Sequence, residues 1–429
     1  MVKRLLIVLF VFVLLASFVL PAAQASAIST PYTLHTGPLF NNPYVKSQQY
    51  AILDDNVAAI KNTPRGAIIH VAMWAFDYKW ATNALIDAHK RGVDVRIIFD
   101  GIVLKFPNST REYNRLKAVL GTNINARSYV KLCMGGCMSS NSMMHAKYMT
   151  ISKLGLQRTI ATKVVMSGSG NISYGAATLS FNEQYTLQGN DAIYNGYVKY
   201  FNDMKVDRDR TNYAMTVTTP KYKAYFAPEA WNEKVPDTVE QIFKNVRCTG
   251  AAPGYGSKGR TLVKVSIFSW SAERVNLARQ LWTLNNWGCD VQVIYGSRSR
   301  MDPAVVSALL KPGSKGGGVK LYVSNTQNPG DPTGKERIFL HHKVFMINGN
   351  YLGNTRSKIV FTGSGNFDWT SLRTANEQTL KIIDDTHYGL YARNFYIIRD
   401  NYSQPITPAG VAAGTSAAAT AGDDANDDN

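Results

Sequence analysis

An internal repeat constrains the fold of this sequence more than any other feature. Residues recur after an offset of about 196 positions, so that Trp74, for example, is matched with Trp270. Residues 68–101 read as an apolar strand, a helix and a second strand, and the same order returns from residue 264 onward. Strands joined in this way pair in parallel, with the helix covering the sheet. The repeat therefore predicts an α/β fold made of two similar halves.

The repeat continues into polar residues, which core packing alone would not repeat. Packing constrains the spacing of apolar side chains, so His, Lys, Asn and Glu recurring in one order indicate a shared active site. Three polar elements match between the halves: a His-x-Lys motif at 145–147 and 341–343, a Gly-Ser-Gly-Asn run at 168–171 and 363–366, and an Asn-Glu pair at 182–183 and 376–377.

The repeated side chains suit chemistry on a phosphodiester. Its anionic oxygens repel nucleophiles, so an enzyme without a metal needs cations and hydrogen-bond donors around them. One neutral imidazole can attack phosphorus while a second, protonated, donates to the leaving oxygen. The candidate catalytic residues are His145, Lys147, His341, Lys343, Glu183 and Glu377, and the candidate phosphate-binding residues are Ser169, Asn171, Ser364 and Asn366.

The two glutamates are expected to orient the histidines. An imidazole needs its tautomer fixed, commonly by a carboxylate on its other nitrogen. Glu183 and Glu377 follow the Asn of each Gly-Ser-Gly-Asn run by 12 and 11 residues. We expect each glutamate to return on the following strand and reach the histidine of its own half.

With these motifs in view, nearly the whole mature chain resembles the phospholipase D superfamily, whose mark is a duplicated H-x-K-x4-D motif followed by G-S-x-N. The resemblance implies two phospholipase D-like halves, each a mixed, largely parallel sheet flanked by helices, packed about a pseudo-twofold axis. It also implies double displacement through a phosphohistidine, without a metal or another cofactor, with alcohols able to replace water. By motif order His145 is the nucleophile and His341 the general acid; the reverse assignment stays open.

The sequence departs from the family motif at its aspartate. Ser152 and Asn348 stand where H-x-K-x4-D has Asp, which in the family mainly supports the structure away from the phosphate. This loss motivates a further hypothesis, a non-catalytic binder of anionic ligands, against which the retained His, Lys, Asn and Glu argue. His342 occupies the variable motif position, where strand alternation directs it away from His341 and into packing or the surface.

The first 27 residues have the pattern of a secretory signal peptide: a short basic start, an apolar stretch and a small-residue site at 25–27. A membrane anchor is the alternative reading of that stretch. We expect a secreted, extracellular protein with no later membrane span. The expected organisation is a signal peptide at 1–27, an N-terminal half at 28–215, a C-terminal half at 216–404 and a disordered Ala/Gly/Asp tail at 405–429.

Four cysteines in an exported chain predict disulfides, for which three pairings exist. Cys133 and Cys137 bracket a Met-Gly-Gly turn that could close on itself, which would leave Cys248 to pair with Cys289. A metal site is disfavoured because no second Cys or His cluster has zinc-ligand spacing.

The charge balance of 47 Lys and Arg against 30 Asp and Glu indicates an anionic partner without choosing one. The resembled superfamily includes both lipid hydrolases and nucleases, and its small nucleases are typically one half that dimerises. Two fused halves therefore favour a phospholipase D that works as a peripheral protein on phospholipid at a membrane surface. An extracellular nuclease is the alternative, and the duplication makes a monomer sufficient.

Overall fold

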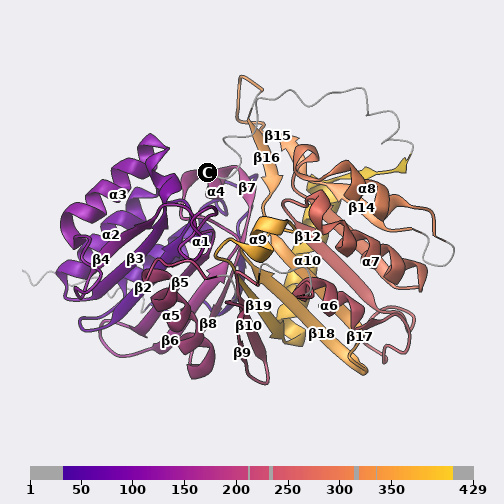
Figure 1. The fold of residues 1–429 in the computed structure, drawn as a ribbon, viewed down its shortest axis with the longest axis horizontal. Helices are drawn as coiled ribbons and strands as arrows, with labels where there is room; N and C mark the ends of the chain where they lie inside the picture. Colours follow the sequence, from indigo (N-terminus) through magenta and orange to yellow (C-terminus); the bar gives the residue numbers. More distant parts are fainter. Residues whose placement is uncertain (1–31, 211–212, 231–234, 314–317, 335, 409–429) are drawn as a thin grey trace, which may run out of the picture. The chain divides into compact units, whose positions relative to one another are not determined.

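The computed structural model describes residues 32–210, 213–230, 235–313, 318–334 and 336–408, and from residue 33 onward they form one compact unit (Figure 1). The predicted signal peptide and residues 409–429 lie outside these ranges. Among the described residues, no helix has the length and apolar character needed to cross a membrane.

The first half contains a seven-stranded sheet with the strand order β1-β8-β6-β5-β2-β3-β4. Its helices and strands are β1 (Gly37–Phe40), α1 (Ala51–Lys61), β2 (Ile68–Met73), α2 (Lys79–Lys90), β3 (Asp94–Asp100), α3 (Pro107–Leu120), β4 (Tyr129–Cys133), β5 (Lys147–Leu154), β6 (Ala161–Gly168), α4 (Tyr174–Thr178), β7 (Ser180–Phe181), β8 (Glu183–Leu187) and α5 (Asp191–Lys205).

The second half contains a larger sheet with the order β20-β14-β13-β12-β17-β18-β19-β10-β9, with β11 paired to β17. Its helices and strands are β9 (Met215–Thr218), β10 (Tyr222–Phe226), α6 (Thr238–Lys244), β11 (Val246–Arg247), β12 (Leu262–Ile267), α7 (Val275–Asn286), β13 (Asp290–Tyr295), α8 (Pro303–Leu310), β14 (Lys320–Val323), β15 (Asn325–Gln327), β16 (Arg337–Leu340), β17 (Lys343–Tyr351), β18 (Asn354–Gly363), α9 (Trp369–Arg373), β19 (Gln378–Ile383), α10 (Asp385–Tyr402) and β20 (Gln404–Ile406).

The predicted α/β fold of two repeated halves is confirmed, but the sheets are not largely parallel. In the first sheet only β2–β3 and β3–β4 are parallel, and in the second only β12–β13 and β13–β14. The strands that carry the polar motifs, β5, β6 and β8 with β17, β18 and β19, pair antiparallel. Short connections join antiparallel neighbours, whereas a parallel pair needs a crossover. The strand–helix–strand unit read from the sequence therefore describes only part of each sheet.

The beginning of the predicted disordered tail is ordered. Pro405 and Ile406 lie in β20, which pairs antiparallel with β14. Ile406 is buried against the second sheet, and this apolar burial distinguishes it from the Ala, Gly and Asp residues that follow.

The two halves exchange contacts reciprocally. Helix α5 of the first half contacts β9 and β10 of the second, and α10 of the second half contacts β1 of the first. Strand β7 of the first half also pairs in parallel with β16 of the second. One apolar core includes side chains from both halves, such as Tyr148, Tyr197, Met346 and Tyr391. The boundary between the halves is therefore part of the folded core, and residues on both sides of it are held in fixed positions.

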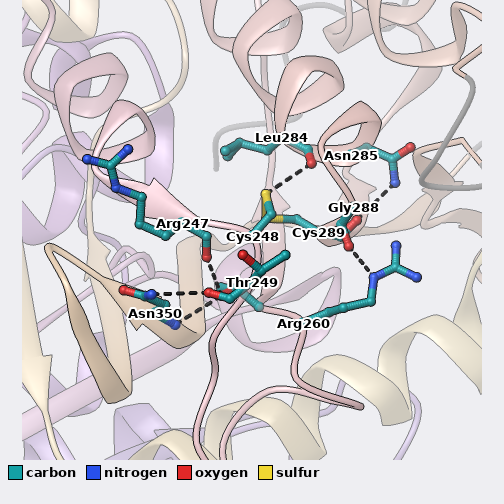
Figure 2. Close-up of a disulfide and its surroundings, with 10 residues drawn as sticks. Arg247, Cys248, Thr249, Arg260, Leu284, Asn285, Gly288, Cys289 and Asn350 are labelled. Atoms are coloured by element: carbon teal, nitrogen blue, oxygen red, sulfur yellow. Dashed lines mark hydrogen bonds between the residues drawn. A yellow bond between two sulfur atoms is a disulfide. The ribbon is translucent and has the colours of Figure 1, made fainter.

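Both predicted disulfides are confirmed, Cys133–Cys137 and Cys248–Cys289. The second joins the residue after β11 to the residue before β13, beside α7 (Figure 2). Arg260 donates to the carbonyl of Gly288 close by, and the Asn350 amide donates to the carbonyl of Thr249 over 3.1 Å. The disulfide therefore joins the end of the short strand β11, which pairs with β17, to the beginning of β13.

Removing Cys248–Cys289 should destabilise the protein more than removing Cys133–Cys137. The two bonds span 41 and 4 residues, and the longer loop restricts the unfolded chain more. We expect the double substitution Cys248→Ala, Cys289→Ala to lower the free energy of unfolding by about 4 kcal/mol. Urea unfolding of both double variants without reductant measures this, and an equal or larger loss for the short loop would contradict it.

Candidate active site

The two His-x-Lys motifs lie at the boundary of the halves, at the beginning of equivalent strands. β5 begins at Lys147 and β17 at Lys343, and each motif histidine directly precedes its strand. All four side chains are buried. Each lysine donates through Nζ to the carbonyl of its own motif histidine, over 2.9 Å for Lys147 and 3.0 Å for Lys343. The hydrogen bond within each motif thus fixes its backbone, while the side chain of its histidine contacts the opposite half.

His145 is bonded to a carboxylate from the other half. Its Nδ1 lies 2.8 Å from Oε1 of Glu377, whose second oxygen accepts from the Ser364 hydroxyl. Burial pushes the pKa of Glu377 upward, but His145 and Lys147 outweigh it and hold that pKa below its ordinary value. Glu377 is therefore a carboxylate that fixes the Nδ1–H tautomer of His145 and directs Nε2 away. The expected pairing within one half is wrong for Glu377.

His341 is bonded to an amide instead. Its Nδ1–H donates to Oδ1 of Asn182 over 2.8 Å, and the same oxygen accepts from the Ser169 hydroxyl over 3.0 Å. Nζ of Lys343 lies 2.7 Å from Nε2 of His341, which accepts because an ammonium can only donate. His341 is thus oriented as firmly as His145 but without a negative charge beside it. The expectation that Glu377 orients His341, and Glu183 orients His145, within their own halves is wrong.

The backbone register explains this asymmetry. The serine of each Gly-Ser-Gly-Asn run donates its backbone N–H over 3.0 Å to the carbonyl of Glu183 in the first half and of Gln378 in the second. Glu183 therefore corresponds to Gln378, and Asn182 corresponds to Glu377. The sequence match of the two Asn-Glu pairs is therefore one residue out of register. Side-chain types alone could not reveal this shift.

Glu183 lies fully buried beneath the site, away from both motif histidines in the hydrogen-bond network. The Tyr391 hydroxyl donates to its Oε2 over 3.1 Å. Burial raises the pKa of Glu183 from 4.5 to about 7, and hydrogen bonds and the charge of Lys343 only partly oppose this. The carboxyl therefore gains or loses its proton near neutral pH.

Replacing Glu183 with Gln should flatten the dependence of stability on pH. The folded-state pKa of Glu183 lies above the unfolded value, so the folded protein binds more protons between pH 4.5 and 7. Its free energy of unfolding should therefore fall across that interval as the pH rises, by about 3 kcal/mol from this one group. Denaturant unfolding at pH 5 and pH 8 tests this, with Glu336→Gln at an exposed site as the control. A wild-type stability that rises with pH in step with the variant would contradict it.

The Gly-Ser-Gly-Asn runs end β6 and β18 and lead into short helices. A Cβ atom on Gly168 or Gly363 would lie 2.0 Å from a carbonyl oxygen of the neighbouring strand, so only glycine permits this approach. Asp368 caps the helix after the second run, as Ser173 caps the helix after the first. The runs thereby hold the hydroxyls of the motif serines against the residues that orient the two histidines.

Of the asparagines of these runs, Asn171 is buried and Asn366 is partly exposed, with its Oδ1 buried. Asn171 accepts the backbone N–H of Ala75 over 3.3 Å. The backbone N–H of Asn366 donates to the Ser371 hydroxyl over 3.2 Å, while Oδ1 of Asn366 has no hydrogen-bond partner within the part of the chain described. Both predicted phosphate-binding amides are thus positioned by their backbone surroundings.

An aromatic ring packs against each motif histidine. Trp74 meets His145 edge-on at 5.6 Å between ring centroids, and Phe268 lies 4.9 Å from His341. Trp270, which the sequence matched with Trp74, is buried in the core of the second half. The equivalent of Trp74 is therefore Phe268, two residues earlier than the sequence match indicated. These rings limit the tilt of both imidazoles.

Asp100 is a site residue that the sequence analysis missed. It ends β3, and its carboxylate accepts the backbone N–H groups of Met144 over 2.7 Å and Ile102 over 2.8 Å. Burial raises its pKa to about 6, although these hydrogen bonds, His145 and Lys147 oppose the rise. It positions the segment entering the first motif. Its place at the carboxyl end of a parallel strand, where sites in such sheets gather, was the available signal.

The residues that stand in place of the motif aspartates, Ser152 and Asn348, make structural hydrogen bonds. The Ser152 hydroxyl accepts the backbone N–H of Ile68 over 2.8 Å, and Oδ1 of Asn348 accepts that of Gly256 over 2.9 Å. His342 is buried beside Ser266, consistent with a packing role. In the described ranges no three His, Cys, Asp or Glu side chains gather as a possible set of metal ligands.

Two α/β halves that meet at paired His-x-Lys and Gly-Ser-Gly-Asn motifs define a phosphoryl-transfer type of centre. The chain belongs to the family described as "Cardiolipin synthase, PLD-like domain", whose model matches residues 57–205 and 257–398, one match in each half. A comparison with curated protein sequences found no match.

Solved structures agree with this fold. A phosphatidylserine synthase from Haemophilus influenzae Rd KW20 is 9% identical with a TM-score of 0.58, covering 88% of this chain and 89% of its own. A polyphosphate kinase from Porphyromonas gingivalis is 14% identical with a TM-score of 0.52, covering 88% of this chain. This chain spans 54% of the kinase, about half of its length. At these identities the similarity establishes the fold alone.

Proposed function

We propose that this protein is a phosphodiesterase that forms a phosphohistidine on His145, with His341 as the general acid. The observation that supports the proposal is the different surrounding of the two imidazoles. Attack through Nε2 leaves the imidazole ring positively charged, and the Glu377 carboxylate 2.8 Å from Nδ1 stabilises that charge. His341 faces the neutral amide of Asn182, so giving up a proton costs it no ion pair.

The two steps balance as a double displacement. Nε2 of His145 bonds to phosphorus as the bond to the leaving oxygen breaks, and protonated His341 gives its proton to that oxygen. Neutral His341 then removes a proton from water or an alcohol, whose oxygen bonds to phosphorus as the bond to His145 breaks. Nε2 of His341 carries the proton in both steps, so in the protonated state Lys343, which donates to this nitrogen in the free protein, must donate to the phosphate instead.

The lysines and amides supply the positive side of the phosphate site. The buried Lys343 has its Nζ beside the imidazole of His341, and the buried Lys147 has its Nζ on the backbone carbonyl of His145. Asn171 and Asn366 are the candidate amide donors. In the free protein both ammonium groups donate to their own motifs. A phosphate oxygen would take over part of these hydrogen bonds and stabilise the charge that builds up during transfer.

For the substrate we propose a phospholipid, hydrolysed to phosphatidic acid and free headgroup, with transfer to alcohols as a side reaction. The net charge of +17 favours an anionic surface. The family description names a cardiolipin synthase, and a similar structure is a phosphatidylserine synthase. One chain supplies both motifs, so a monomer is sufficient. Two disulfides favour action outside the cytoplasm. An extracellular nuclease remains the second candidate because of the same charge.

Headgroup release from phosphatidylcholine vesicles in EDTA, measured beside plasmid cleavage, tests this proposal. Wild type should release choline and leave DNA intact, and His145→Ala should release no choline. Added ethanol should divert part of the product to phosphatidylethanol. DNA cleavage alone would replace the lipid assignment with a nuclease. If wild type shows neither activity, and wild type and His145→Ala both bind anionic vesicles, the protein is a binding protein.

A further inference from the structure

A cavity of about 220 Å³ adjoins the catalytic residues on the second half. Lys343, Asn366 and Glu377 are among its lining residues. The other lining residues include ones from β9, β10 and β19 of the second sheet and from helix α6. A substituent on a phosphate held by Lys343 and Asn366 would therefore have this cavity directly beside it.

The equivalent space in the first half is filled. Two cavities there border Lys147 and Asn171, and each is only about 10 Å³. Helix α1 places Ile52 and Asn56 at these positions. Helix α6, which precedes β12 as α1 precedes β2, has 7 residues where α1 has 11. The two ester arms of a phosphodiester would thus meet different surroundings, with room on one side.

The walls of this cavity are largely apolar. They include Met215, Phe226, Val239, Ile242, Phe345 and Leu372. An apolar cavity of about 150 Å³ in a protein stays dry and accepts benzene, so the volume here suffices for a hydrocarbon segment of several carbons. Burial of each methylene group contributes about fourfold to affinity.

We propose that this cavity binds the hydrocarbon arm of a phosphodiester next to its phosphate. The inference rests on the proposed function, because Lys343 and Asn366 would hold that phosphate. A nucleoside fits less well, since most of the wall is apolar and its ring nitrogens and carbonyls would find few partners there, Thr216, Glu229 and Thr238 among them. Two polar groups of the lining are already engaged: Arg274 pairs with Asp237 over 2.8 Å, and the Ser371 hydroxyl accepts from Asn366.

Binding of alkyl phosphates tests the cavity without requiring turnover. Calorimetry at fixed ionic strength compares methyl phosphate, hexyl phosphate and thymidine monophosphate on wild type. Two variants fill the cavity from opposite walls, Val239→Trp from α6 and Met215→Trp from β9. Val119→Trp, on the exposed surface of α3, is the matched control. Hydrolysis of methyl p-nitrophenyl phosphate reports separately on the catalytic centre.

Wild type and Val119→Trp should bind hexyl phosphate at least about tenfold more tightly than methyl phosphate. Both cavity-filling variants should reduce this ratio to near one, with the affinity for methyl phosphate within about twofold of wild type. A wild-type ratio near one, tighter binding of thymidine monophosphate, no binding of any of the three, or a ratio that survives in both variants would overturn the proposal. A preserved hexyl preference without hydrolysis would refute the proposed function and leave the cavity assignment standing.

Discussion

Replacing His341 with Asn should leave the first step of the reaction intact on an activated ester, whereas replacing His145 with Asn should abolish it. A p-nitrophenolate group leaves without a proton, so His341→Asn can still form the phosphohistidine on His145. The second step then lacks its base. We expect a burst of one p-nitrophenolate per enzyme, followed by turnover lowered by at least about 1,000-fold. His145→Asn should give no burst and lose about 10,000-fold or more of the turnover.

Stopped-flow absorbance measures the burst, and mass spectrometry of the peptide containing residue 145 locates the acid-labile phosphoryl group. His342→Asn is the control, because this buried imidazole faces Ser266 and takes no part in the mechanism. It should retain turnover within about tenfold. A burst in His145→Asn, with none in His341→Asn, would reverse the two assignments.

The sequence predicted the duplication, both disulfides and the motifs, because these depend on residue types at fixed spacing. It did not predict how the motif strands pair. β5 and β6 join through a short loop, and β6 and β8 through a connection that carries the Gly-Ser-Gly-Asn run and a short helix; such connections have no hydrophobic period from which pairing could be read. The strand–helix–strand unit has a clear hydrophobic periodicity, and its prediction is confirmed.

Within the site, the errors were errors of register. Asn182 and Glu377 occupy equivalent positions, as do Trp74 and Phe268, and neither pair shares a residue type. A match of identical letters cannot find such pairs, since the strands place residues by backbone hydrogen bonds and not by side-chain identity. The partner of each histidine also comes from the other half. That exchange depends on how the halves pack, for which the sequence of one half has no signal.

Replacing Glu377 with Gln should slow formation of the phosphohistidine by about 1,000-fold, the second large effect we expect. The amide removes the negative charge beside the charged imidazole, and its NH₂ group can force the wrong tautomer on His145. Single-turnover release of p-nitrophenolate measures the step. Ser364→Ala keeps the carboxylate and removes only one of its hydrogen bonds, so it should cost no more than about tenfold. Equal losses in the two variants would show that geometry, and not charge, is what Glu377 provides.

The reciprocal change, Asn182→Asp, places a carboxylate beside the other histidine and tests the general acid. A negative charge next to His341 favours its protonated form and raises its pKa, so the alkaline limb of the kcat/KM profile should move up by about one pH unit. The proton would be held more tightly, so the plateau rate on an unactivated phosphodiester should fall. An alkyl phosphodiester with a poor leaving group is the substrate to use, because only there does the acid limit the rate. An alkaline limb that stays in place would mean that His341 does not supply this proton. Together with the loss in Glu377→Gln, it would leave His145 as the nucleophile and require a proton donor other than His341 for the leaving oxygen.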